Sequence, residues 1–297
     1  MKFDKPAMST EHMIENLIKH GMRISNMDEC LEALSTINYY RLSTYWFHFK
    51  IELGGGDYRF IDGLDFQTVL AHHEFDRKLR NLVLQGTEII EIALRQSLSS
   101  YLALSHGAFG HQDSSIFEDP ANWKQSIQKM LNDYHKSREE FAKHFQVKYS
   151  EHLLPPVWVS MELASFGTLS HFYANIKSAE GRGIISKKFD LDEVVLTSFL
   201  RHLTIVRNIC AHHARLWNRR FPIKMKLPNN VPTEVRALLN REASAMGRIY
   251  NSIVVMDYVL KVVRPDFELL HRFEELLNNF PQIDPAALGH KRKFLAE

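Results

Sequence analysis

Cysteine is scarce in this sequence, with two in 297 residues. Cys30 and Cys210 lie far apart, and neither belongs to a CxxC motif or to a Cys/His spacing typical of zinc ligands. Gly54–Gly56 lacks the GxxxxGK[ST] pattern of a phosphate-binding loop. We therefore expect no disulfide framework, no metal and no cofactor, and the reducing cytoplasm as the compartment.

Long apolar runs are also absent. No stretch of about 18 uncharged apolar residues occurs, and the first twenty residues carry a charge every few positions. This predicts a soluble, unexported protein with no membrane partner. Apolar residues still make up 45% of the chain, which is enough for a sizeable core.

Signals for β-strands are sparse, whereas apolar residues recur at helical spacing. The pattern predicts helices over residues 9–20, 27–34, 65–104, 122–145 and 194–210, and, after a proline-rich connector, over 233–263 and 265–279. The three glycines of 54–56 predict a turn. The sequence therefore predicts an all-α bundle.

Acidic residues are missing from one long segment. Between Glu193 and Glu234 there is no Asp or Glu, but there are seven basic residues: Arg201, Arg207, Arg215, Arg219, Arg220, Lys224 and Lys226. The segment thus carries +7 and the rest of the chain −5, although the formal net charge is only +2. Such a positive segment suits a partner rich in phosphate groups.

The stretch RNICAHHARLWNR (207–219) lies within that segment. On a helix that turns about 100° per residue, Arg207, Asn208, His212 and Arg215 share one arc. A guanidinium binds phosphate oxygens at two points, and an imidazole accepts and donates protons near neutral pH. Together they predict metal-free acid–base cleavage of a phosphodiester. The alternative is that Arg207 and His212 pair within a helical bundle and that the basic run is a solvated surface.

Four blocks of the sequence carry a resemblance: INYYRLSTYWFHF (37–49), FDRKLRNLVLQGTEIIEIALR (75–95), WVSMELASFGTLS (158–170) and RNICAHHARLWNR. In this order they resemble the abortive-infection (Abi) family of bacterial phage-defence proteins, the group that includes AbiD and AbiF, over roughly residues 15–220. The RNxxxH pattern of Arg207, Asn208 and His212 is similar to the motif of HEPN domains. These helical folds often act as metal-independent endoribonucleases, and they usually dimerise so that two motifs share a cleft.

The resemblance implies a HEPN-like helical core at 61–220, between an N-terminal segment (1–60) and a C-terminal helical extension (221–297). It implies a toxin-like endoribonuclease of phage defence that leaves 2′,3′-cyclic phosphate and 5′-hydroxyl ends and forms a homodimer. Arg207, Asn208 and His212 are then the catalytic residues. The implied partner is RNA: tRNA, mRNA or a small partner RNA. The alternatives are a non-catalytic RNA-binding module and a scaffold in which the four blocks only form the core.

Further residues are assigned supporting roles. Glu88, Glu91 and Arg95 share one helix face, and the resemblance implies that this helix packs beside the Arg–His motif. They would then orient His212 or pair with Arg207, or else form a structural ion-pair network. For RNA binding, the prediction is Arg201, Arg215, Arg219, Arg220, Lys224, Lys226, Tyr40 and Arg41. Aromatic rings such as Tyr40 stack on unpaired bases, although core packing is the favoured interpretation for most of the aromatic cluster at residues 39–47.

Overall fold

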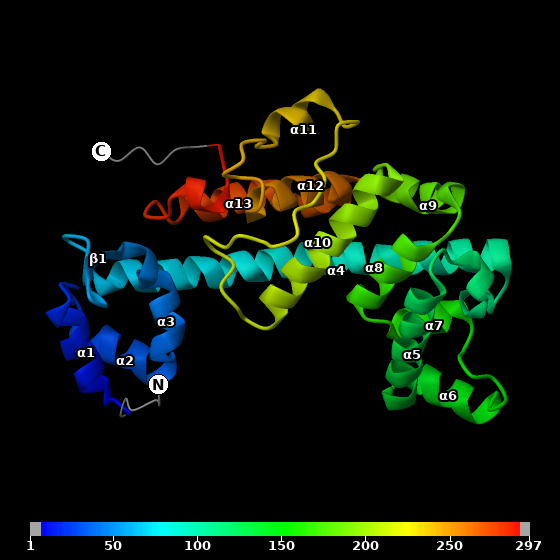
Figure 1. The fold of residues 1–297 in the computed structure, drawn as a ribbon, viewed down its shortest axis with the longest axis horizontal. Coiled ribbons are helices and arrows are strands. Elements are labelled where there is room, and N and C mark those ends of the chain that lie inside the picture. The colour runs from blue at the N-terminus through cyan, green and yellow to red at the C-terminus, as the bar shows by residue number, and fades with distance from the viewer. Residues whose placement is uncertain (1–6, 292–297) are drawn as a thin grey trace. The chain divides into compact units, whose positions relative to one another are not determined.

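The computed structural model describes residues 7–291, which are predominantly helical (Figure 1). Within these residues the sheet is a single antiparallel hairpin of β1 (Lys50–Gly54) and β2 (Asp57–Phe60). Gly54, the last residue of β1, and Gly55 and Gly56, which join it to β2, all have positive φ, so the predicted turn is confirmed. The predicted all-α fold is likewise confirmed.

Two compact units make up the chain. Unit 1 comprises Met1–Leu79 with Leu276–Asp284, and unit 2 comprises Arg80–Glu275 with Pro285–Glu297. The boundary falls inside α4 (Phe66–His106), which is one uninterrupted helix of 41 residues. The three-part division made from the sequence stays a prediction.

Unit 1 contains α1 (Thr10–Lys19), α2 (Met27–Thr36), α3 (Tyr39–Trp46), the hairpin and the first part of α4. The hydroxyl of Ser9 accepts a hydrogen bond from the backbone N–H of His12 at 3.3 Å and thereby caps the start of α1. Tyr45 is buried and donates to Asp76 at 2.6 Å. Within the aromatic cluster of 37–49, Tyr45 and Trp46 are therefore core, whereas Tyr40 is 73% and Phe47 62% exposed.

Unit 2 contains the rest of α4 and most of the remaining helices: α5 (Pro120–Lys136), α6 (Glu140–Lys148), α7 (Val157–Leu163), α8 (Phe166–Asn175), α9 (Ala179–Ser186), α10 (Glu193–Ala211), α11 (Thr233–Leu238), α12 (Ile249–Val263) and α13 (Leu269–Asn278), whose last residues belong to unit 1. In α12, every residue from Ile249 to Leu260 is buried. Helix α10 packs against α8 and α9, and α5 packs against α7 and α8. This packing holds α10 in place along its length.

The single helix predicted over 233–263 is wrong, because the structure has α11 and α12 with an irregular segment between them. The reason is a pair of asparagines. The backbone N–H of Asn240 donates to the side chain of Asn251 at 2.8 Å, and the Asn251 side chain donates back to the Asn240 carbonyl at 2.7 Å. These bonds satisfy the backbone without a helix, and no local periodicity reports them.

Helix α10 is long and apolar enough to cross a membrane by length and composition alone. However, 44% of its apolar window is buried inside the protein, and core helices of soluble proteins pass the same test. The cytoplasmic location stays a prediction.

Candidate active site

Helix α10 carries the Arg–His motif, made of Arg207, Asn208 and His212, at its C-terminal end. Asp192 caps its start by accepting from the N–H of Val195 at 2.8 Å. One stripe of the helix is buried: Leu196, Phe199, Leu200, Leu203, Val206 and Cys210. The stripe fixes the rotation of α10 about its axis, and therefore the direction in which its polar residues point.

The helix ends at Ala211 in a Schellman motif. The N–H of His213 donates to the Cys210 carbonyl and that of Ala214 to the Ile209 carbonyl, both at 3.0 Å. His213 takes the left-handed conformation, with φ 55°, at a position where glycine is the usual residue. The chain therefore leaves the helix axis directly after His212.

The predicted arc is thus wrong for Arg215, which lies beyond the end of the helix. Its Nη1 donates to the Trp217 carbonyl at 2.7 Å, and its own carbonyl accepts from Nε of Arg219 at 2.6 Å. Trp217, in the same loop, is buried. Two of the arginines predicted to bind RNA are therefore tied into the turn that follows the motif.

Arg207, Asn208 and His212 keep the exposure that a site requires. The Arg207 side chain is 39% exposed, and Asn208 and His212 are both exposed. Nη1 of Arg207 lies 3.4 Å from Oδ1 of Asn208. Among residues 7–291, the imidazole of His212 has no hydrogen-bond partner. Neither the guanidinium nor the imidazole is sealed inside apolar packing.

Glu91 joins α4 to this motif. Its Oε2 lies 3.8 Å from Nε of Arg207, and its Oε1 lies 2.5 Å from Nη2 of Arg95. Nη1 of Arg95 donates to three carbonyls at the end of α7, those of Met161, Glu162 and Ala164, at 2.6–2.8 Å. Glu88, by contrast, is exposed. Of the three predicted supporting residues, Glu91 therefore contacts Arg207, and Arg95 reaches it only through Glu91.

Arg207 faces an open cavity of about 620 Å³. Its charged lining comprises Glu91, Arg95, Asp133, Lys136, Arg138, Glu139, Glu162 and Arg207. Lys136, at the end of α5, and Arg138, just after it, add to Arg207 two cations that sequence reasoning missed, because no local pattern links them to residue 207. Burial raises the pKa of Asp133. Asn208 and His212 are not part of this lining, so a single chain brings Arg207 alone into the cavity.

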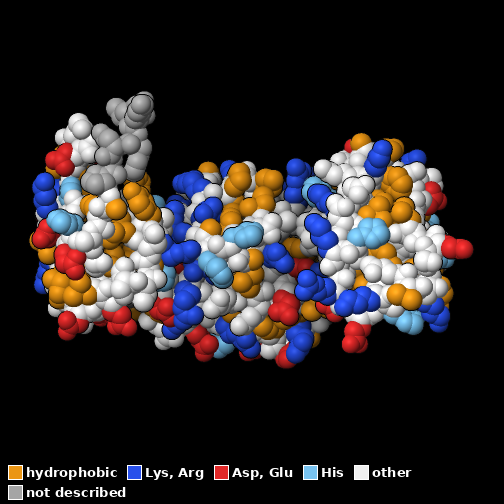
Figure 2. Space-filling view, turned by 90° about the horizontal axis from the view of Figure 1, so that it is seen from below, with side chains coloured by type: hydrophobic (Ala, Val, Ile, Leu, Met, Phe, Trp, Pro, Cys, Tyr) orange, Lys and Arg blue, Asp and Glu red, His pale blue; other side chains and the backbone are white. Residues whose placement is uncertain are grey.

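The other predicted RNA contacts lie elsewhere. Arg201, Arg220, Lys224 and Lys226 are exposed in unit 2, and Tyr40 and Arg41 are exposed in unit 1. On the face drawn in Figure 2, Lys and Arg side chains lie among histidines and apolar groups.

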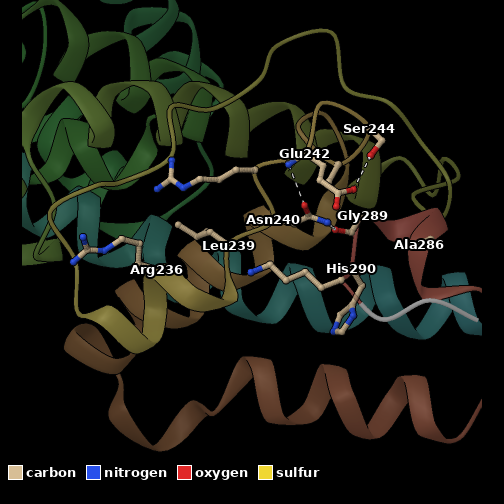
Figure 3. Close-up of a pocket in the computed structure, with 11 residues that line it drawn as sticks. Arg236, Leu239, Asn240, Glu242, Ser244, Ala286, Gly289 and His290 are labelled. Carbon is tan, nitrogen blue, oxygen red and sulfur yellow. Dashed lines mark hydrogen bonds between the residues drawn. The ribbon is translucent and has the colours of Figure 1, made fainter.

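A larger cavity, of about 730 Å³, lies in the C-terminal part of unit 2 (Figure 3). At its centre the buried Asn240 donates to the Gly289 carbonyl at 3.0 Å and accepts from the N–H of Glu242 at 3.1 Å. None of the predicted catalytic residues lines it. Cavity size alone does not point to the Arg–His motif.

A buried histidine, His111, lies next to α7. Nε2 of His111 is 3.1 Å from the hydroxyl of Ser160, which itself donates to the Pro155 carbonyl at 2.9 Å. Burial lowers the pKa of His111 to about 4. The buried, neutral imidazole of His111 therefore contacts α7, the helix whose last carbonyls accept hydrogen bonds from Arg95.

A family model for Abi-like proteins matches residues 32–218, which is more than half of the chain. The match contains the Arg–His motif and the whole of α4 and α10. No curated protein and no solved structure matches the chain.

Proposed function

Since the chain belongs to the Abi-like protein family, and thereby to the proteins of abortive infection and phage defence, we propose that it is a HEPN-type endoribonuclease of the AbiD and AbiF kind. It acts as a toxin-like effector on RNA. The observation that carries the proposal is the exposure of Arg207, Asn208 and His212 at the end of one helix. A guanidinium and an imidazole in reach of solvent supply the two functions that phosphodiester cleavage needs without a metal ion.

Each residue has a role in the proposed reaction. His212 takes the proton of a ribose 2′-hydroxyl as that oxygen attacks the adjacent phosphorus, or it gives a proton to the leaving 5′-oxygen. Arg207 stabilises the negative charge that develops on the phosphate oxygens. Asn208 orients the phosphate. The products carry 2′,3′-cyclic phosphate and 5′-hydroxyl ends.

A homodimer supplies the second proton-transfer group in this proposal. Within one chain, His212 is absent from the cavity that Arg207 lines. When two α10 ends face each other, His212 of the partner subunit complements the Arg207 of the first. One imidazole then acts as the base and the other as the acid.

The test is cleavage of tRNA and total RNA in the presence of EDTA. Wild type is expected to cleave, and His212→Ala is expected to lose at least about 100-fold in rate. The matched control is His271→Ala, which removes an exposed histidine from α13. Cleavage by the His212 variant at the wild-type rate contradicts the proposal, as does cleavage that stops with EDTA.

A second candidate is a non-catalytic module that holds a structured or small partner RNA. It is favoured by one observation, namely that no side chain of residues 7–291 hydrogen-bonds to the His212 imidazole and fixes its tautomer. This candidate predicts that wild type, Arg207→Ala and His212→Ala bind RNA with salt-dependent affinity while all three leave it intact.

A further inference from the structure

A second groove of unit 2 is basic and differs from the Arg207 cavity. It measures about 580 Å³ and lies between the C-terminal end of α8, α9, α10 and the connector after α10. Its charged lining comprises Glu118, Lys177, Arg182, Glu193, Arg201, Lys224 and Lys226. None of the three proposed catalytic residues belongs to it.

The cations of this groove are mostly unneutralised. Arg182 pairs with Glu193 at 2.6 Å, which accounts for one charge of each sign. Within the described chain, no carboxylate lies within ion-pair distance of the four remaining cations, which are Lys177, Arg201, Lys224 and Lys226. All four are exposed. The one other charged residue of the lining is Glu118, so the groove has a net positive charge.

The groove continues past Arg201 into a smaller cavity of about 310 Å³. The two cavities share Ala174, Thr197 and Arg201. The smaller one adds polar groups from α5 and α8, among them Asn122 and His171. Burial, and after it the positive charges of Lys129 and Arg201, lowers the pKa of His171. The positive region therefore extends along α8 and is not confined to one point.

The connector that carries two of these cations is held in place. His202, on α10, contacts the Ile223 carbonyl through Nδ1 and the Ser252 hydroxyl through Nε2, both at 2.7 Å. The N–H of Lys226 donates to the Ser198 hydroxyl at 2.8 Å. Met225 is buried between the exposed Lys224 and Lys226. The backbone is thus fixed while both ammonium groups remain in solvent.

The groove is also aligned with the catalytic motif. Arg201 and Asn208 are seven positions apart on α10, which places them about 20° apart around the helix and about 10 Å apart along it. Both are exposed. A strand that lies on Arg201 is therefore directed along the helix face of Asn208, towards His212.

From these observations we propose that this groove binds the phosphate backbone of a single RNA strand outside the cleavage site. Lys177, Arg201, Lys224 and Lys226 contact successive phosphates, and the strand then passes Asn208 to reach Arg207 and His212. The proposal rests on the proposed function for its choice of RNA. An extended groove with separated cations fits a polyanion better than a single phosphate group does.

The test measures binding in a chain that does not cleave. Full-length His212→Ala is titrated with a fluorescent oligo(U) of roughly 20 nucleotides over a range of salt concentrations. In the same background, Lys224→Ala/Lys226→Ala removes two groove cations. Lys143→Ala/Lys148→Ala is the matched control, because it removes two exposed lysines of α6 that line neither this groove nor the Arg207 cavity.

For single strands, the slope of log K against log salt changes by about 0.7 for each phosphate contact. The groove variant is expected to lose about 1.4 of this slope and to bind roughly 10-fold more weakly at moderate salt, while the control keeps the slope of its parent. The proposal is overturned if the groove variant keeps the salt slope of its His212→Ala parent, or if that parent does not bind oligo(U). If the wild type binds RNA through the groove but never cleaves it, the groove proposal stands and the proposed nuclease function is overturned.

Discussion

Two regions of unit 2 share the carboxylate of Glu91, which lies close to Arg95 in one region and farther from Arg207 in the other. At the α7 corner, made of Arg95, His111, Ser160 and residues 161–164, the Arg95 side chain is 14% exposed and donates to three carbonyls and to Glu91. At the α10 end, residues 207–214, Arg207 is 39% exposed and lies 3.8 Å from the same Glu91. A guanidinium has five N–H donors. Those of Arg95 are largely used within the protein, whereas Arg207 keeps donors for a ligand.

Removal of Arg95 should give the largest loss of stability. Arg95→Ala leaves three carbonyls at the end of α7 and most of Glu91 without their donor, and we expect unfolding to become easier by about 3–5 kcal/mol. Denaturant unfolding measures this. The matched control is Arg264→Ala, whose side chain is 61% exposed and pairs with an exposed Asp266, so its change should stay below about 1 kcal/mol. Equal effects of the two variants would remove the contrast between the two regions.

Arg207 should show the opposite behaviour. Arg207→Ala is expected to lower RNA cleavage by about 10²–10³-fold, because the charge on the phosphate is no longer stabilised. Its free energy of unfolding should change by less than about 1 kcal/mol. Arg207→Lys keeps the positive charge but lacks the planar guanidinium, and its cleavage rate should fall between those of wild type and Arg207→Ala. A variant that unfolds as readily as Arg95→Ala would show that Arg207 is structural.

Acid should weaken the α7 corner through His111. Its ordinary pKa of 6.5 falls to about 4 in the folded protein, so the unfolded chain binds more protons between these values. The contribution of neutral His111 to the free energy of unfolding is therefore complete above pH 6.5 and is lost as the pH falls through 4. The loss amounts to about 3 kcal/mol at most. His111→Gln should flatten the dependence of unfolding free energy on pH in that window. His271→Gln, at an exposed site, should leave it unchanged.

The smallest effect should come from His213 at the α10 end. Glycine accepts the left-handed conformation that His213 adopts, so His213→Gly should stabilise the protein by about 0.5–1 kcal/mol. Cleavage should stay within about twofold of wild type, because His212 supplies the proposed acid or base. Thermal unfolding and the EDTA-resistant cleavage assay measure the two quantities. A loss of cleavage as large as that of His212→Ala would move the catalytic role to His213.

The sequence predicted the helices better than the turns and breaks that separate them. The apolar period predicts α1 over residues 9–20 and α10 over 194–210, each within one residue of its observed ends. The arc that included Arg215 was wrong because it continued α10 past this end, where a histidine occupies the left-handed position at which glycine would have signalled the stop. The break before α12 was missed because it depends on hydrogen bonds between Asn240 and Asn251. Both are decided by contacts that periodicity does not contain.

The candidate site was predictable where its residues are close in sequence. Arg207, Asn208 and His212 were proposed from one short stretch, and the helix of Glu91 was placed beside them by resemblance. Lys136 and Arg138 reach the Arg207 cavity only through the packing of α5, far away in sequence. Lys177 likewise joins the basic groove through tertiary structure. Side chains that gather in this way leave no local signature.

Unit 1 is completed by nine residues near the end of the chain. Phe280, in Leu276–Asp284, packs edge-on against Phe75 of α4, with ring centroids 5.6 Å apart, and Lys78 lies over the Phe280 ring. During synthesis this part of α4 leaves the ribosome long before Phe280 does. The N-terminal unit therefore finishes folding only after residues 276–284 have been made. A truncated product would consequently lack a finished unit 1, even if all of its helices α1 to α4 had been translated.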